Sequence, residues 1–179
     1  HQLYNEGRFD EALDLLREGL QLYPNAVELH VGLAYAYLAR EDYAWARQNF
    51  ERALALDPDH EDTLAGYGEV LLKLGQRPPA LAAFDRILSL GFREDHELML
   101  QIGRALFREG LVAAAQQFFE YAVNAQPDCP EAAACVDVLR NAGLELSHLD
   151  AIDRATRAAE GQRSWLARWK VGDALKQRF

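Results

Sequence analysis

The 179 residues are 50% hydrophobic and carry 19 Lys and Arg against 28 Asp and Glu, for a formal net charge of −9. So large a hydrophobic fraction excludes a disordered chain, and the acidic balance argues against a nucleic-acid-binding surface, which needs Lys and Arg to neutralise phosphates. No run of about 18 apolar residues, the length that would span a membrane, is present.

A period of 34 residues organises the first 127 positions. Pro24 and Pro58 lie 34 residues apart, as do Phe50 and Phe84, whereas Phe119 follows Phe84 by 35. The extra residue falls near 91–93. Each period has the pattern of two amphipathic helices joined by a tight turn, so we expect a stack of helical hairpins.

The expected helices follow, in chain order, from apolar spacing and from Gly and Pro at their ends. In a partial first unit, Gly7 is expected to end a helix, as Gly75 and Gly110 are in later units. The other helices are expected at residues 27–40, 43–56, 61–74, 77–90, 95–109, 112–125, 130–142, 147–160 and 162–178.

These helices group into units of one continuous domain. The units are a partial repeat at 1–26, full repeats at 27–60, 61–95 and 96–129, a degenerate repeat at 130–160, and a capping helix at 161–179.

Two kinds of side chain recur in phase and predict how the helices pack. Large apolar residues, Phe50, Phe84 and Phe119, are expected to fill the gap between one hairpin and the next. Small residues recur where the two helices of a hairpin must approach closely, because a larger side chain would push their axes apart. These small residues are Ala34, Gly68, Gly103, Ala46, Ala80 and Ala115.

The family unit of the tetratricopeptide repeat reads Leu-Gly-x2-Tyr, then Ala-x3-Phe and then Pro, and over about residues 1–127 this chain resembles it. The matching first-helix segments are Leu33-Ala34-x2-Tyr37, Tyr67-Gly68-x2-Leu71 and Ile102-Gly103-x2-Leu106, and Ala-x3-Phe follows in each of these units. The resemblance implies an all-α fold, a right-handed α-α superhelix of about four to five helical hairpins with a C-terminal capping helix. Two features depart from the family pattern. His30, Leu64 and Met99 stand where the family has an early Trp, and Phe92 stands where the third unit should close with Pro.

The resemblance also implies that the first helices of successive units line a concave groove, which receives an extended peptide or a partner helix. We hypothesise that Arg104 and Arg108 pair with an acid on a bound segment, while an apolar column of the groove anchors that segment. The column consists of Tyr4, Leu38, Leu72 and Phe107. Plain packing between helices is the alternative for that column. At the groove rim lie Glu28, Asp62 and Glu97. The candidate peptide-binding residues are Tyr4, Tyr35, Leu38, Leu72, Lys73, Arg104, Phe107 and Arg108.

No arrangement typical of an enzyme or cofactor site is found. The acidic run at 57–62 lacks the Gly and Glu positions of a calcium loop and indicates a turn with acids at a helix N-terminus. Cys129 and Cys135 have neither zinc-ligand spacing nor a nearby His. We therefore expect no catalysis, no metal and no cofactor. The matching positions also lack the clamp by which some family members grip a chaperone's C-terminal carboxylate.

The tail is basic, since residues 147–179 hold 7 Lys and Arg against 4 Asp and Glu. Trp165, Leu166 and Trp169 are expected to help the last helix cap the open end of the stack. Homodimerisation through this helix is an alternative, and docking on an anionic membrane surface is a less favoured one.

These features predict a protein–protein interaction scaffold or adaptor. The alternatives are a self-assembling structural repeat protein and a repeat module of a larger protein, such as a secretion or assembly chaperone. No secretion signal opens the sequence, which slightly favours the cytoplasm, and the periplasm is the alternative if a preceding segment is missing.

Overall fold

The computed structural model describes the backbone of residues 2–128 and the side chains of residues 10–128. The helices expected beyond residue 128 lie outside the described residues, as do Cys129, Cys135, Trp165, Leu166 and Trp169.

The described part of the chain is all α-helical apart from its turns. Each of the six helices expected between residues 27 and 125 is present, and its ends fall within one residue of the predicted ends. The elements are α1 (Gln2–Leu22), α2 (Val27–Ala39), α3 (Tyr43–Leu56), α4 (Glu61–Lys73), α5 (Arg77–Ser89), the short 3₁₀ helix η1 (Phe92–Glu94), α6 (His96–Arg108) and α7 (Val112–Ala125).

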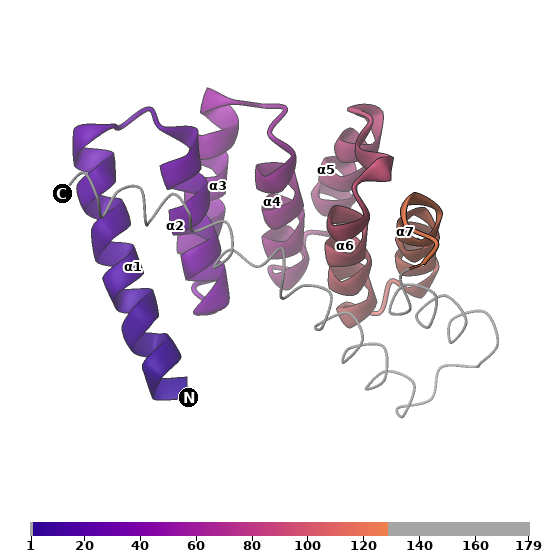
Figure 1. Ribbon diagram of the computed structural model, residues 1–179, viewed down its shortest axis with the longest axis horizontal. Coiled ribbons are helices and arrows are strands. Elements are labelled where there is room, and N and C mark those ends of the chain that lie inside the picture. Colours follow the sequence, from indigo (N-terminus) through magenta and orange to yellow (C-terminus); the bar gives the residue numbers. More distant parts are fainter. Residues whose placement is uncertain (1, 129–179) are drawn as a thin grey trace.

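The helices form a row of hairpins, which Figure 1 shows side by side. Within the hairpins, α2 packs on α3, α4 on α5, and α6 on α7. The first helices also contact one another in succession, α2 with α4 and α4 with α6. This is the arrangement expected of a tetratricopeptide repeat stack. None of the described helices is both long and apolar enough to cross a membrane.

The prediction that Gly7 ends a helix is wrong. Helix α1 runs without a break from Gln2 to Leu22 and passes through Gly7. The few residues before Gly7 are too short to form a stable helix of their own, whereas continuing the helix adds one backbone hydrogen bond per residue. The first hairpin of the described chain is therefore the one made by α2 and α3.

The turns inside the next two hairpins match the prediction. Gly75 and Gly110 both have a φ of +78°, in the left-handed region that glycine adopts without steric penalty. In the first hairpin Glu41 takes the same role with a φ of +63°. The extra residue of the third unit is accommodated by the turn at Gly91 and by η1, which follows it.

The predicted small and large residues form the core. The four alanines of the small set and the three phenylalanines are all buried. A Cβ atom added to Gly68 would lie 2.4 Å from the Phe84 ring, and one added to Gly103 would lie 2.7 Å from the Phe119 ring. These aromatic rings therefore fill space within their own hairpin. Phe84 also reaches the next hairpin, where its ring centroid lies 6.2 Å from that of Phe118.

Candidate functional site

The inner face of the stack is the side on which α2, α4 and α6 follow one another. At its centre the Tyr35 hydroxyl donates to the Asp62 carbonyl oxygen at 2.6 Å and accepts from Gln101 Nε2 at 3.2 Å. The Tyr35 ring passes over Gly66, where an added Cβ would lie 2.8 Å from the ring. Because Tyr35 belongs to α2 and Gln101 to α6, the inner sides of these two helices meet across α4.

A charged cluster lies beside this contact. Burial raises the pKa of Glu69 on α4, and the nearby charges of Arg104, Arg108 and Lys73 oppose the increase, as does a hydrogen bond with Gln101. Arg104 is only 8% exposed. The cations that were predicted to meet an acid on a partner therefore lie close to an acid of the chain itself.

An ion pair lies at the far end of the charged cluster. Lys73 Nζ lies 3.2 Å from Glu109 Oε1, which joins the last turn of α4 to the end of α6. Arg77 Nη2 donates to the Glu109 carbonyl oxygen at 3.1 Å. A carboxylate on a partner would have to compete with Glu69 and Glu109 for these positive groups.

The predicted apolar column is mostly buried. Leu72 is 3% and Phe107 6% exposed, and both belong to the hydrophobic core, whereas Leu38 is only partly buried. The side chain of Tyr4 lies outside the described residues. Burial favours the packing alternative for Leu72 and Phe107, and an anchoring role for any of these residues stays a prediction.

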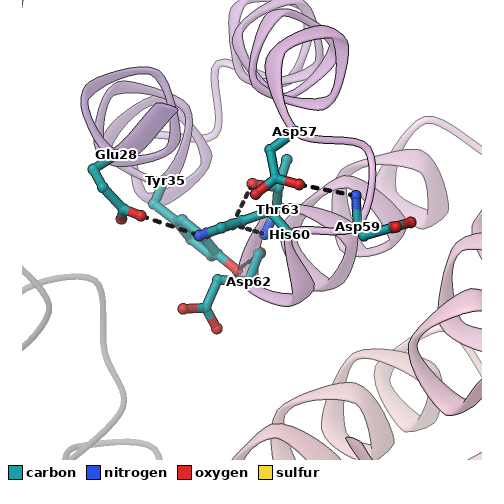
Figure 2. Close-up of polar contacts among 7 residues, drawn as sticks. All are labelled: Glu28, Tyr35, Asp57, Asp59, His60, Asp62 and Thr63. Atoms are coloured by element: carbon teal, nitrogen blue, oxygen red, sulfur yellow. Dashed lines mark hydrogen bonds and ion pairs between the residues drawn. The ribbon is translucent and has the colours of Figure 1, made fainter. Parts of the chain in front are cut away.

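The acidic rim lies at the N-terminal ends of the inner helices, and Figure 2 shows its part around His60. His60 Nε2 lies 3.2 Å from Glu28 Oε1, which links the start of α4 to the start of α2. The other ring nitrogen, Nδ1, lies 2.8 Å from Thr63 Oγ1 and accepts from the Thr63 backbone N–H at 3.3 Å. His60 thus caps α4 and connects two hairpins.

The acidic run at 57–62 is a turn that leads into a helix N-terminus, as predicted. Asp57 Oδ1 accepts the Asp59 backbone N–H at 3.2 Å, which closes the turn, and Asp59 pairs with Arg86 at 2.6 Å (Figure 2 shows the turn). Among residues 10–128 no three His, Cys, Asp or Glu side chains come together as a metal-binding group.

The link between His60 and Glu28 predicts a small pH dependence of stability. The hydrogen bond with Glu28, followed by the charges of Glu28, Glu61 and Asp62, raises the pKa of His60 above its ordinary value of 6.5. Glu28 therefore favours the protonated ring in the folded state, and in that form Nδ1 donates to Thr63 Oγ1 instead of accepting from the Thr63 backbone N–H. The stabilisation by Glu28 is fully present below pH 6.5 and is lost as the pH rises through the raised pKa.

Replacing Glu28 by Gln should consequently lower the free energy of unfolding below pH 6.5 and have little effect at pH 9. Because Glu28 is largely exposed, we expect a loss of no more than about 0.5 kcal/mol. Urea unfolding curves of both proteins at pH 5.5 and pH 9 check this. A loss that is equal at the two pH values would show that His60 does not titrate against Glu28.

One member of the inner face, Gln101, was not among the residues predicted to face the groove. Gln101 occupies the repeat position that Gly32 and Gly66 hold in the preceding units. A polar side chain that replaces glycine on the inner side of one unit was a usable signal. The partner of Gln101, Tyr35, lies 66 residues earlier, and the packing of α2 on α4 and of α4 on α6 brings the two together.

Comparisons with known proteins show the repeat family and its fold. A sequence profile of the tetratricopeptide repeat matches residues 1–61 and 67–133, and a second profile of the same repeat matches residues 37–92. Among solved structures, a double mutant of MamA is 20% identical with a TM-score of 0.61, and the alignment covers 90% of each chain. YrrB, described as a TPR protein with an unusual peptide-binding site, is 25% identical with a TM-score of 0.54, over 94% of this chain and 87% of its own.

Curated relatives match over shorter parts of their length. DnaJ homolog subfamily C member 3 of Rattus norvegicus is 30% identical over 152 residues, which is 82% of this chain and 30% of the relative. Protein CTR9 homolog of Arabidopsis thaliana is 43% identical over 68 residues, which is 36% of this chain and 6% of the relative. The chain therefore spans less than a third of either relative.

Proposed function

Because the chain belongs to the tetratricopeptide repeat family, we propose that it is a protein–protein interaction scaffold that binds a peptide segment or a helix of a partner on the inner face of α2, α4 and α6. The family is one of repeat scaffolds that are typically not catalytic. The observation that carries the proposal is the hydrogen bond between Tyr35 and Gln101. It joins the first and third inner helices across the second, so that one ordered surface is present before a partner arrives, and preorganisation of this kind lowers the ordering cost of binding.

The inner face has opposite charges at its two edges. Acids lie in the first turns of the three inner helices, at Glu28, Asp62 and Glu97, whereas basic residues lie in the last turns of α4 and α6, at Lys73 and Arg108. A partner segment with basic side chains toward the first edge and acidic side chains toward the second would match this distribution. Such complementarity sets the orientation and specificity of binding more than its affinity.

The residues of this face that a partner can reach differ from those that only shape it. Leu38 is partly exposed, and Lys73 and Arg108 are exposed. Leu72 and Phe107 lie beneath the surface. We assign direct contact to the first three residues and support of the surface to the other two.

Charge reversal at the basic edge tests the proposal. In affinity capture from a lysate of the native cells, Lys73→Glu/Arg108→Glu should recover at least about tenfold less partner than the intact chain, because two attractive contacts become repulsive. The matched control is Arg47→Glu/Arg52→Glu on the outer helix α3, which changes the net charge by the same amount. Circular dichroism must show equal helicity for the two variants.

Equal recovery by the two variants would contradict binding at the basic edge. A mass that rises with concentration in light scattering, without any captured partner, would instead support the self-assembling alternative.

A further inference from the structure

A second surface, away from the inner face, carries an exposed aromatic pair. Trp45 lies in the first turn of the outer helix α3 and is 56% exposed. Its ring stacks on that of Tyr37 from α2, with centroids 6.0 Å apart and an interplanar angle of 26°. Tyr37 is buried, so the indole is the part of the pair that solvent reaches.

Three helices fix the position of this pair. Arg17 of α1 donates from Nη2 to the Tyr37 hydroxyl at 2.6 Å, and its Cζ lies 5.9 Å from the centre of the Tyr37 ring. Asn49 Nδ2 donates to the Trp45 carbonyl oxygen at 2.8 Å, within α3. Tyr37 therefore already receives one guanidinium of the chain itself, whereas the indole of Trp45 remains largely open.

The surroundings of the pair are acidic. Asp14 pairs with Arg17 at 3.5 Å, and Arg40 lies 3.0 Å from Asp10 and 3.8 Å from Asp42. Glu41, in the turn between α2 and α3, is also exposed. Three of these carboxylates pair with Arg17 or Arg40, and the exposed Glu41 adds a further negative charge four residues before Trp45. An aromatic face in a negative field attracts a cation, and Trp is the side chain that attracts it most strongly.

We propose that Trp45 and the adjacent carboxylates form a second docking site, for an arginine-bearing segment of a partner protein. A guanidinium fits better than an ammonium, because its planar group stacks on an indole while its N–H groups donate to a neighbouring carboxylate such as Asp42. The site is independent of the inner face, since it lies on α1, on the C-terminal half of α2 and on the start of α3. A scaffold with both surfaces holds two segments at once.

Nuclear magnetic resonance of the indole N–H groups tests this site directly. The full chain has three Trp, and a Trp45→Phe variant identifies the signal of Trp45. The probe is the peptide Gly-Ser-Arg-Gly-Arg-Ser-Gly, and its control is the same peptide with both Arg replaced by citrulline, which keeps the shape and removes the charge. The arginine peptide should shift the Trp45 signal saturably, and the citrulline peptide should bind at least about fivefold more weakly.

Variants distinguish binding of the arginine peptide at Trp45 from its general attraction to an acidic protein. Trp45→Ala should weaken binding of the arginine peptide about fivefold, Trp45→Phe should weaken it less, and Lys73→Glu/Arg108→Glu should not weaken it. Because Trp45 is exposed, thermal melting should confirm that both Trp45 variants stay folded. Equal affinity of Trp45→Ala and the intact chain, or no shift of the Trp45 signal, would overturn the proposal. So would a Trp45 signal that moves with protein concentration alone, since a second copy of the chain would then occupy the surface.

Discussion

Replacing Phe84 by Ala is expected to lower the free energy of unfolding by about 3 to 5 kcal/mol. The ring is 1% exposed, fills the space above Gly68 within its own hairpin, and contacts Phe118 of the next hairpin. Removing it leaves a cavity that two rigid helix pairs cannot close. Urea unfolding followed by circular dichroism measures the loss. Phe92→Ala in η1 is the matched control, and because Phe92 is only partly buried, its loss should be less than half as large.

The close contact between Gly68 and Phe84 gives a second test of the same packing. A Cβ atom on Gly68 would lie 2.4 Å from the Phe84 ring, so Gly68→Ala should destabilise by about 1 to 3 kcal/mol. A smaller side chain at position 84 makes room for that methyl group. The double variant Gly68→Ala/Phe84→Leu should therefore lose less stability than the sum of the two single changes. Additive losses would show that the two positions do not share this space.

Replacing Arg104 by Met is expected to destabilise the protein by about 1 to 3 kcal/mol at pH 7, because it removes a buried cation from beside the partly buried carboxylate of Glu69. Replacing Glu69 by Gln should destabilise the protein less than this. It removes a carboxylate whose ionised form burial disfavours, but it also leaves the buried Arg104 without that counter-charge. In the double variant Glu69→Gln/Arg104→Met, most of the loss should be recovered.

The contribution of Glu69 to stability should decrease as the pH rises. The pKa of Glu69 is raised above its ordinary value of 4.5, so the folded state binds the proton more tightly than the unfolded state does. The penalty for ionising Glu69 is absent below pH 4.5 and is fully present above the raised pKa, and stability falls as the pH rises between the two. In the Arg104→Met variant, stability should fall more steeply as the pH rises.

Urea unfolding of the four proteins at pH 4.5, 6 and 8 checks these expectations. Arg104→Met should lose stability relative to the intact chain as the pH rises, whereas the double variant should not. A loss in Arg104→Met that is the same at all three pH values would mean that Arg104 acts by packing its side-chain carbons and not by its charge.

The helices could be predicted closely because one signal repeats in each unit. Aromatic residues such as Phe84, small residues such as Gly68 and the turn glycines recur at nearly constant spacing, and their packing needs only neighbours in the same or the adjacent hairpin. Gly7 shows where this reasoning fails. A glycine permits a left-handed turn, but whether a helix stops there depends on the packing partner on either side of the turn, which local spacing does not contain.

The candidate site was predictable in part. Repeat phase placed Tyr35, Lys73 and Arg108 on the first helices, but it did not reveal that Leu72 and Phe107 are buried, because burial depends on how closely neighbouring hairpins pack. The contact between Gln101 and Tyr35 depends on the same packing. The contact of Arg17 with Tyr37, on which Trp45 stacks, likewise joins residues of two different units.

Site-specific photo-crosslinking in the native cells tests the inner-face proposal most directly. A benzophenone side chain at position 38 lies at the partly exposed edge of the inner face, and one at position 48 lies on the outer helix α3, where Gln48 is exposed. We predict a discrete cross-linked product from position 38 that position 48 does not give and that Lys73→Glu/Arg108→Glu removes. A product that forms only from position 48, or that forms from position 38 in spite of the charge reversal, would contradict binding on the inner face.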